Sequence, residues 1–185
     1  MSTIGVISDT HGLLREEAVR ALDGSDLILH AGDVGDRGII DRLADIAAVW
    51  AVRGNTDHGA LARSLPATQV VDLSSGAQPR AAIPAPEGTP VGAPSTPDYA
   101  PGAGPFAYVI HELDLLDLDP VAAGIRVVVY GHTHVPDVAV RSGVLYFNPG
   151  AAGHRRFRLP ITVGRLVVEG DEIAAHILHL DVGGS

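Results

Sequence analysis

The sequence predicts an α/β protein in which two mixed β-sheets pack together and helices flank them. Strand-like and helix-like segments alternate in the N-terminal part of the chain, whereas the C-terminal part holds strand-like segments joined by short turns. This order favours a two-sheet sandwich over a simple doubly wound sheet. The chain has 185 residues, of which 46% are hydrophobic, and this is enough for one domain with a substantial core.

The composition narrows the chemistry that the chain can perform. A net charge of -9 argues against broad binding to nucleic acid or to an anionic membrane. Because the sequence has no cysteine, disulfides, iron–sulfur clusters and thiolate catalysis are excluded. Any metal must therefore bind imidazole, carboxylate or amide oxygen, a set that suits manganese, iron, zinc or magnesium. With no signal peptide or long apolar segment in the sequence, we expect a cytoplasmic protein.

The first strand is expected at Thr3–Ser8, and it runs directly into Asp9 and His11. These two residues follow the carboxyl end of a strand, where α/β sheets place their sites. A helix is predicted over Leu13–Leu22, because apolar residues recur there at helical spacing.

The next two strands repeat the pattern of the first. Strands are expected at Asp26–His30 and Val49–Val52, with a helix at Arg37–Ile46 between them. The first of these strands is followed by Gly32-Asp33, and the second by Gly54-Asn55-Thr56-Asp57. Three successive strand ends thus carry oxygen or imidazole ligands, which is an uncommon coincidence.

The middle of the chain changes in composition. Val70–Leu73 is predicted as an edge or hairpin strand, and residues 76–105 form an insertion rich in proline, alanine and glycine. The insertion lacks the large apolar side chains that a core needs, so we expect a long surface loop. It is either a lid or interface element or an elongation without a role, and we favour the latter.

Regular structure is expected again after the insertion. A strand at Phe106–His111 is followed by a helix at Leu113–Ala123, which Pro120 shortens or breaks. A buried strand at Ile125–Tyr130 then leads into Gly131-His132-Thr133-His134. Three further segments are predicted as antiparallel strands, namely Val144–Phe147, Ile161–Val168 and Glu172–Leu180.

Seven candidate metal ligands lie at the predicted strand ends: Asp9, His11, Asp33, Asn55, His111, His132 and His134. Two neutral imidazoles aimed at one point usually indicate a metal. Because seven ligands exceed the needs of one ion, we predict two metals. The two oxygens of Asp33 make it the natural bridge between them.

This ordered set of motifs resembles a known family. Asp-x-His, Gly-Asp, Gly-Asn-x-Asp, His and Gly-His-Thr-His together are similar to the calcineurin-like metallophosphoesterases. The short chain and the form Gly-Asn-Thr-Asp resemble the small prokaryotic phosphodiesterase branch, the YfcE-like proteins. The resemblance covers the chain from Ile4 to about Leu180, except for the insertion, and Asn148-Pro149-Gly150 fits the same branch.

The resemblance implies a fold, two metal sites and a reaction. The fold is a four-layer α-β-β-α sandwich. The first metal would be held by Asp9, His11, Asp33 and His134, and the second by Asp33, Asn55, His111 and His132. Manganese is the expected ion, with nickel, iron, zinc or cobalt as alternatives. Asp33, Asn55 and His111 would serve catalysis, in which a metal-bridging hydroxide attacks the phosphorus of a small phosphodiester in line.

Other functions remain open from the sequence. The same site could act as a phosphomonoesterase, or the fold could be a non-catalytic scaffold that binds proteins. The expected partner is a small phosphoester substrate, with no nucleic acid and no membrane, and a homo-oligomer is left open. Retention of all the predicted ligands favours the enzyme over the scaffold.

Several residues next to the motifs carry lesser predictions. Thr56 stands where phosphoprotein phosphatases have a histidine that protonates a leaving group, so no general acid is assigned. Glu112 follows His111, where the family usually has glycine. Asp57 is predicted to orient a ligand histidine or the Asn55 loop, with turn capping as its alternative. For the arginines of residues 154–158 we favour a solvated loop over guidance of an anionic substrate.

Overall fold

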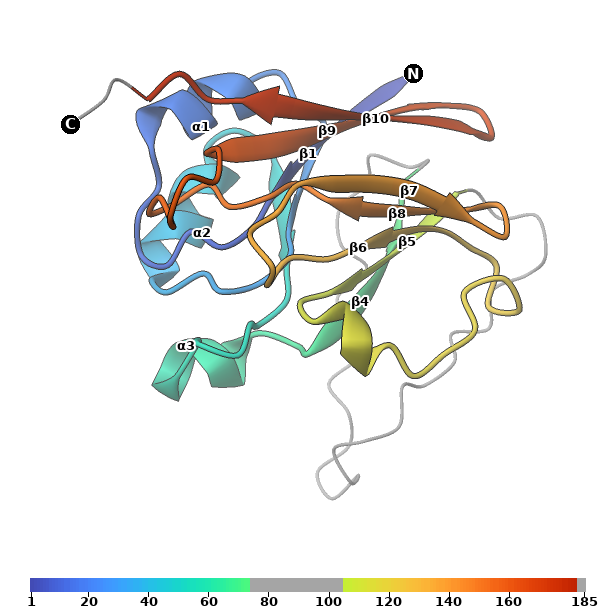
Figure 1. Ribbon diagram of the computed structural model, residues 1–185, viewed down its shortest axis with the longest axis horizontal. Helices are drawn as coiled ribbons and strands as arrows, with labels where there is room; N and C mark the ends of the chain where they lie inside the picture. The colour runs from blue at the N-terminus through green and yellow to red at the C-terminus, as the bar shows by residue number, and fades with distance from the viewer. Residues whose placement is uncertain (74–104, 183–185) are drawn as a thin grey trace.

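The computed structural model describes residues 1–73 and 105–182. Two five-stranded sheets pack face to face, and helices cover the outer side of one of them (Figure 1). The predicted two-sheet α/β sandwich with flanking helices is confirmed. Almost all of the insertion predicted at residues 76–105 lies outside the described residues.

The first sheet has the strand order β10-β9-β1-β2-β3. Its strands are β1 (Ser2–Ile7), β2 (Leu27–His30), β3 (Ala48–Ala51), β9 (Thr162–Glu169) and β10 (Glu172–His179). The first three are parallel to one another, β9 is antiparallel to β1, and β10 forms a hairpin with β9. The carboxyl ends of the three parallel strands therefore lie at the same edge of the sheet.

The second sheet has the strand order β4-β5-β6-β8-β7. Its strands are β4 (Thr68–Asp72), β5 (Phe106–Ile110), β6 (Ile125–Val129), β7 (Asp137–Arg141) and β8 (Val144–Asn148). Strands β5, β6 and β8 are parallel, so the predicted antiparallel role of Val144–Phe147 holds only for its pairing with β7. The sequence analysis did not predict β7, a short edge strand on which Val138 and Val140 remain exposed.

Helices α1 (Glu16–Leu22) and α2 (Arg37–Ala44) pack on the outer face of the first sheet. The predicted helix at Leu13–Leu22 begins three residues late, because Leu13 donates to the carbonyl of Thr10 and closes a turn there. The side chain of Asp36 caps α2 by accepting a hydrogen bond from the N–H of Gly38 at 2.7 Å. A third helix, α3 (Gly59–Ser64), was not predicted.

The predicted helix at Leu113–Ala123 was wrong. This segment forms one 3₁₀ turn, η1 (Leu113–Leu115), followed by turns. Pro120 cannot donate a helical hydrogen bond, and the carboxylate of Asp119 instead accepts from the N–H groups of Val121 and Ala122. In the described residues the outer layer of the second sheet is therefore thin, and leucines of this segment cover the sheet.

The main core lies between the sheets, where one face of every strand except β7 contributes buried or partly buried apolar side chains. A second cluster fills the space between the first sheet and its helices. None of the helices in residues 1–73 and 105–182 is long and apolar enough to cross a membrane.

His30 is fully buried at the end of β2. Its Nδ1 accepts from the N–H of Gly32 at 3.2 Å, and its Nε2 lies 3.0 Å from the hydroxyl oxygen of Thr10. That hydroxyl donates to the carbonyl of Val34 at 2.9 Å, so Nε2 of His30 carries the hydrogen. The neutral imidazole is satisfied at both nitrogens, and burial lowers its pKa to about 4.

This lowered pKa predicts a loss of stability in acid. Below pH 6.5 the unfolded chain takes up a proton at His30, whereas the native protein does not until the pH nears 4. The free energy of unfolding attributable to His30 should fall by about 2 kcal/mol between pH 7 and pH 5. Urea unfolding of metal-free wild type and His30→Gln at both pH values measures this, since the variant should lose less stability in acid. His58→Gln, at an exposed position, is the control and should behave like wild type.

Candidate metal centre

The seven predicted ligands, hereafter the strand-end cluster, lie together at one end of the sandwich. They follow five strands from both sheets: Asp9 and His11 after β1, Asp33 after β2, Asn55 after β3, His111 after β5, and His132 and His134 after β6. Parallel strands bring their carboxyl ends to one edge, and packing of the two sheets brings the two edges together.

Most of these residues have an unusual backbone conformation. Among the cluster, φ is positive at Asp9 (54°), His11 (47°), Asp33 (54°), His132 (68°) and His134 (60°). Residues other than glycine rarely adopt this left-handed conformation, which costs about 1 kcal/mol or more each. The chain therefore turns sharply after β1, β2 and β6, and the fold maintains this strain where the side chains meet.

One half of the cluster is formed by Asp9, His11 and His134. The Nε2 atoms of the two histidines lie 3.3 Å apart. Oδ1 of Asp9 lies 3.3 Å from Nε2 of His134 and 3.8 Å from Nε2 of His11. Oδ2 of Asp33 completes this half, at 3.7 Å from Nε2 of His11.

The other half is formed by Asp33, Asn55, His111 and His132. Oδ2 of Asp33 lies 3.4 Å from Nε2 of His111. Oδ1 of Asn55 lies 3.1 Å from Nε2 of His111 and 3.2 Å from Nδ1 of His132. A single oxygen of Asp33 thus stands between the two halves.

The donor set fits metal ions. Oδ1 of Asp9 is buried and has no hydrogen-bond partner in the described residues, although two imidazole nitrogens face it. His111 donates its Nδ1–H to the carbonyl of Ala31 at 2.7 Å, which leaves the lone pair of Nε2 directed into the cluster. Lone pairs that converge in this way repel one another unless a cation lies among them.

The pKa values of the two carboxylates in the cluster are shifted in opposite directions. Burial raises the pKa of Asp9, and the hydrogen bond from Ser8 offsets this only in part. Burial also acts on Asp33, but the imidazole of His111 at 3.4 Å and the hydrogen bond from the N–H of Thr56 outweigh it and hold the pKa of Asp33 well below its usual range. Asp33 is therefore a carboxylate throughout the physiological pH range.

The pKa values of the two buried histidines in the cluster are also shifted in opposite directions. The pKa of His134 is lowered, mainly by burial, which favours the neutral form that binds metal. Burial would also lower the pKa of His111, but Asp33 and the carbonyl of Ala31 would stabilise its protonated form, and they raise the pKa overall. Protons therefore compete with a metal more strongly at His111 than at His134.

Two glycines allow the strand ends to approach so closely. A Cβ at Gly131 would lie 2.0 Å from Oγ of Ser8, and a Cβ at Gly32 would lie 2.7 Å from Nδ1 of His111. Both distances are too short for any real side chain, so glycine is required at these positions for the cluster to form.

Several polar residues fix the loops that carry the cluster. As predicted, Asp57 orders the Asn55 loop, because its carboxylate accepts from the N–H groups of Gly54 and Gly35 at 2.8 Å each. Within the described residues its hydrogen bonds come from backbone N–H groups, and none comes from a ligand histidine. The side chain of Asn148 donates to the carbonyl of Gly131 at 2.9 Å and to the hydroxyl of Thr133 at 3.1 Å. This role was not predicted, although the Asn-Pro-Gly signal after β8 marked the residue.

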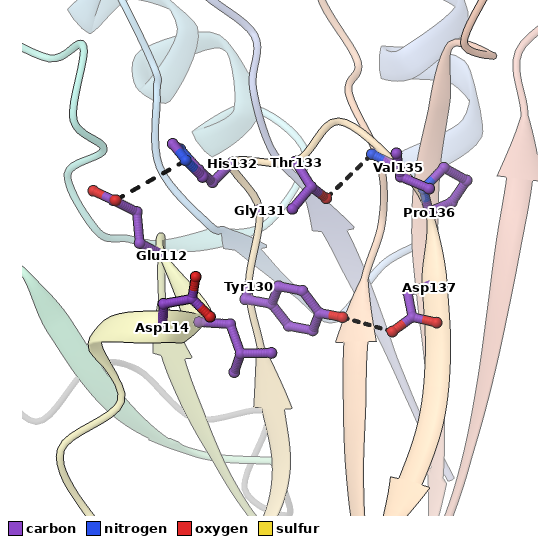
Figure 2. A pocket seen from close by; sticks show the side chains of 10 residues that line it. Glu112, Asp114, Tyr130, Gly131, His132, Thr133, Val135, Pro136 and Asp137 are labelled. Carbon is purple, nitrogen blue, oxygen red and sulfur yellow. Dashed lines mark hydrogen bonds and ion pairs between the residues drawn. The ribbon is translucent and has the colours of Figure 1, made fainter.

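A pocket of about 450 Å³ opens beside His132 (Figure 2). Among the described residues, three carboxylates line it, those of Glu112, Asp114 and Asp137, and no arginine does. Oε2 of Glu112 lies 4.0 Å from Nε2 of His132, so the carboxylate is at the pocket wall and does not come between His111 and Asn55. Asp137 accepts a hydrogen bond from the hydroxyl of Tyr130 at 2.7 Å.

Residues 154–158 are exposed, as predicted for a solvated loop, but one of their arginines also contacts the cluster. Nη2 of Arg156 lies 3.5 Å from Nε2 of His11, and Arg156 is not among the described residues that line the Glu112 pocket. Arg155 and Arg158 make no such contact among the described residues. Arg37 pairs with Asp41 on the surface of α2 at 3.0 Å, away from the cluster's hydrogen bonds.

The fold and the strand-end cluster together define an α/β protein with a candidate metal site at the carboxyl ends of its strands. Residues 2–171 match the model of the calcineurin-like phosphoesterase superfamily domain. The chain therefore belongs to the calcineurin-like phosphoesterase superfamily, and the predicted resemblance is confirmed.

Individual relatives and solved structures agree with this assignment. A probable metallophosphoesterase of Methanocaldococcus jannaschii is 31% identical over 96% of this chain and 81% of its own. YfcE, a phosphoesterase from E. coli, has a similar fold, with a TM-score of 0.58 and 23% identity over 89% of this chain and 88% of its own. Vacuolar protein sorting 29 from Cryptosporidium parvum has a TM-score of 0.70 and 18% identity over 99% and 93% of the two chains.

Proposed function

We propose that this protein is a dinuclear metal-dependent phosphoesterase that hydrolyses small phosphodiesters, with manganese as its ion. The observation that carries the proposal is the position of Asp33. Its Oδ2 lies within 3.7 Å of His11 and 3.4 Å of His111, so one carboxylate faces both halves of the strand-end cluster. Membership of the phosphoesterase superfamily supports the same reaction.

Each half of the cluster has a role in this proposal. Asp9, His11 and His134 would hold one ion, and Asn55, His111 and His132 the other, with Asp33 between them. When bound, two such ions activate a water molecule near neutral pH and neutralise charge on the phosphoryl oxygens. Asn55 contributes a neutral oxygen, so its half of the site keeps more positive charge for the substrate.

Thr56 shapes the choice of leaving group. Its N–H donates to Oδ1 of Asp33 at 2.8 Å, which holds that carboxylate in place, and its hydroxyl lies 3.4 Å from Nδ1 of His11. A threonine hydroxyl cannot protonate a leaving alcohol at neutral pH. We therefore infer that esters of acidic alcohols, such as aryl esters, are hydrolysed fastest.

Removal and return of the metal test the proposal. Protein treated with EDTA should not hydrolyse bis-p-nitrophenyl phosphate, and Mn²⁺ should restore activity. At about 100 times its dissociation constant, Mn²⁺ should also stabilise the native state by about 2.7 kcal/mol, which denaturant unfolding measures. Failure of Mn²⁺ to bind or to restore hydrolysis would overturn the proposal.

A protein-binding scaffold is the second candidate function. It is favoured by the fold that the chain shares with vacuolar protein sorting 29. A scaffold could still bind metal at this cluster, so metal uptake alone does not distinguish the two. Uptake of Mn²⁺ without hydrolysis of aryl diesters or monoesters would support the scaffold.

The pocket beside His132 indicates the kind of group that the substrate carries. A phosphodiester has one ester group besides the leaving group, and the 450 Å³ pocket next to the cluster has room for a small one. Because carboxylates and no arginine line the pocket in the part of the chain that the structure describes, we infer that this group is neutral or cationic. An anionic group there would face the carboxylates of Glu112 and Asp114.

This inference predicts a change in selectivity when Glu112 is neutralised. Glu112→Gln should raise the KM of a p-nitrophenyl diester with a choline ester group about 3- to 10-fold relative to the matching ethyl ester. Steady-state kinetics on the two substrates measure the ratio. Glu169→Gln, on an exposed residue at the end of β9, is the control and should leave the ratio unchanged. An unchanged ratio in Glu112→Gln would contradict the inferred selectivity.

A further inference from the structure

The loop that follows β8 is held firmly against the first half of the strand-end cluster. The N–H groups of Ala152 and Gly153 donate to the carbonyls of Ser8 and Asp9 at 3.0 and 3.3 Å. Nε of Arg15 donates to the carbonyl of Gly153 at 2.9 Å. A Cβ at Gly153 would lie 2.1 Å from the carbonyl oxygen of Thr10, so the loop lies directly on the backbone that carries Asp9.

The far end of the same loop is equally constrained. The carbonyl of Arg156 accepts from the N–H of Leu159 at 3.1 Å and closes a tight turn. Phe157, at the second position of this turn, has a positive φ of 53° although its side chain is 93% exposed. Strain at an exposed residue shows that the turn is specified by the fold and not by burial of this side chain.

The turn places one cation beside the cluster. Nη2 of Arg156 lies 3.5 Å from Nε2 of His11, the nitrogen that faces Asp9 and Asp33. An imidazole nitrogen has one lone pair, so it cannot serve both a guanidinium and a metal. When His11 binds an ion, the N–H donors of Arg156 must find another acceptor, and a guanidinium beside a dication is favourable only if an anion lies between them.

We propose that Arg156 binds the phosphoryl group of the substrate at the non-bridging oxygens on the His11 side of the site. This inference rests on the function proposed above and adds a recognition residue to it. A guanidinium fork matches the geometry of phosphate oxygens, and such charge-assisted hydrogen bonds are stronger than those between neutral groups. Diesters, monoesters and inorganic phosphate share these oxygens, so inorganic phosphate is a sufficient probe.

Calorimetric titration of inorganic phosphate into the Mn²⁺-loaded protein tests the inference without turnover. Arg156→Ala should weaken phosphate binding about 10- to 100-fold. Arg155→Ala is the matched control, because it removes the same charge from the neighbouring residue, and it should change the affinity by less than about 3-fold. Arg156→Lys should fall between wild type and Arg156→Ala, because lysine keeps the charge but loses the fork.

A parallel titration with Mn²⁺ separates phosphate binding from metal binding. Arg156→Ala should bind Mn²⁺ at least as tightly as wild type, because it removes a cation from the cluster. Loss of Mn²⁺ from Arg156→Ala, or equal phosphate affinity in Arg156→Ala and Arg155→Ala, would overturn the role of Arg156 and leave the proposed function standing. Absence of Mn²⁺ binding in the wild type would overturn both.

Discussion

Replacing Asp33 with asparagine should reduce the hydrolysis of bis-p-nitrophenyl phosphate by about 10³-fold or more. Oδ2 of Asp33 lies between His11 and His111, and the substitution puts either an N–H₂ group or a neutral oxygen there. The nitrogen of a side-chain amide has no lone pair available for a metal ion, and a neutral oxygen bridges two cations poorly. The amide oxygen of asparagine at the Oδ1 position can still accept the N–H of Thr56, so the fold should survive.

The Asp33→Asn experiment needs two measurements. Steady-state kinetics give the loss of kcat, and elemental analysis of the dialysed protein should show fewer than two ions per chain. Asp41→Asn is the control, because Asp41 lies on the surface of α2 and pairs with Arg37. It should keep both the rate and the metal content of wild type. Equal rates in Asp33→Asn and wild type would contradict the enzymatic reading of the cluster.

Gly54→Ala should disrupt the centre through the backbone. A Cβ at Gly54 would lie 2.0 Å from Oδ1 of Asp33 and 2.3 Å from its backbone nitrogen, and the backbone nitrogen cannot move aside on its own. The loop after β3 must therefore shift and lose the 2.8 Å hydrogen bond between the N–H of Gly54 and Asp57. We expect a loss of about 3 kcal/mol in the free energy of unfolding, together with most of the activity.

Gly59→Ala separates this clash from a general effect of replacing glycine. Gly59 begins α3, has a φ of 61°, and has no atom within 4 Å of an added Cβ. Strain alone should cost about 1 kcal/mol there, and activity should persist. Urea unfolding measures both variants, each in the metal-free form. Similar stability losses in the two variants would show that the approach of Gly54 to Asp33 is looser than described.

The fold class could be predicted because periodicity and strand-end motifs are local. Alternation of apolar segments gave nine of the ten strands that the described residues form, each to within two residues at either end. The missing strand, β7, has exposed valines and directly follows the histidine motif, so its apolar pattern does not stand out. The helix predicted at Leu113–Ala123 failed because Pro120 and its preceding aspartate favour turns over a continuous helix.

Which residue types stand at which strand ends could be predicted before the structure, because that information lies in short motifs along the chain. The sequence could not place Arg156, since the distance from residue 156 to His11 depends on how the loop after β8 packs on the loop after β1. Nor could the sequence show that Asn148 donates to the carbonyl of Gly131, or that the carboxylate of Glu112 lies near His132. These contacts join residues from different strands, and only the packing of two sheets at one end of the sandwich decides them.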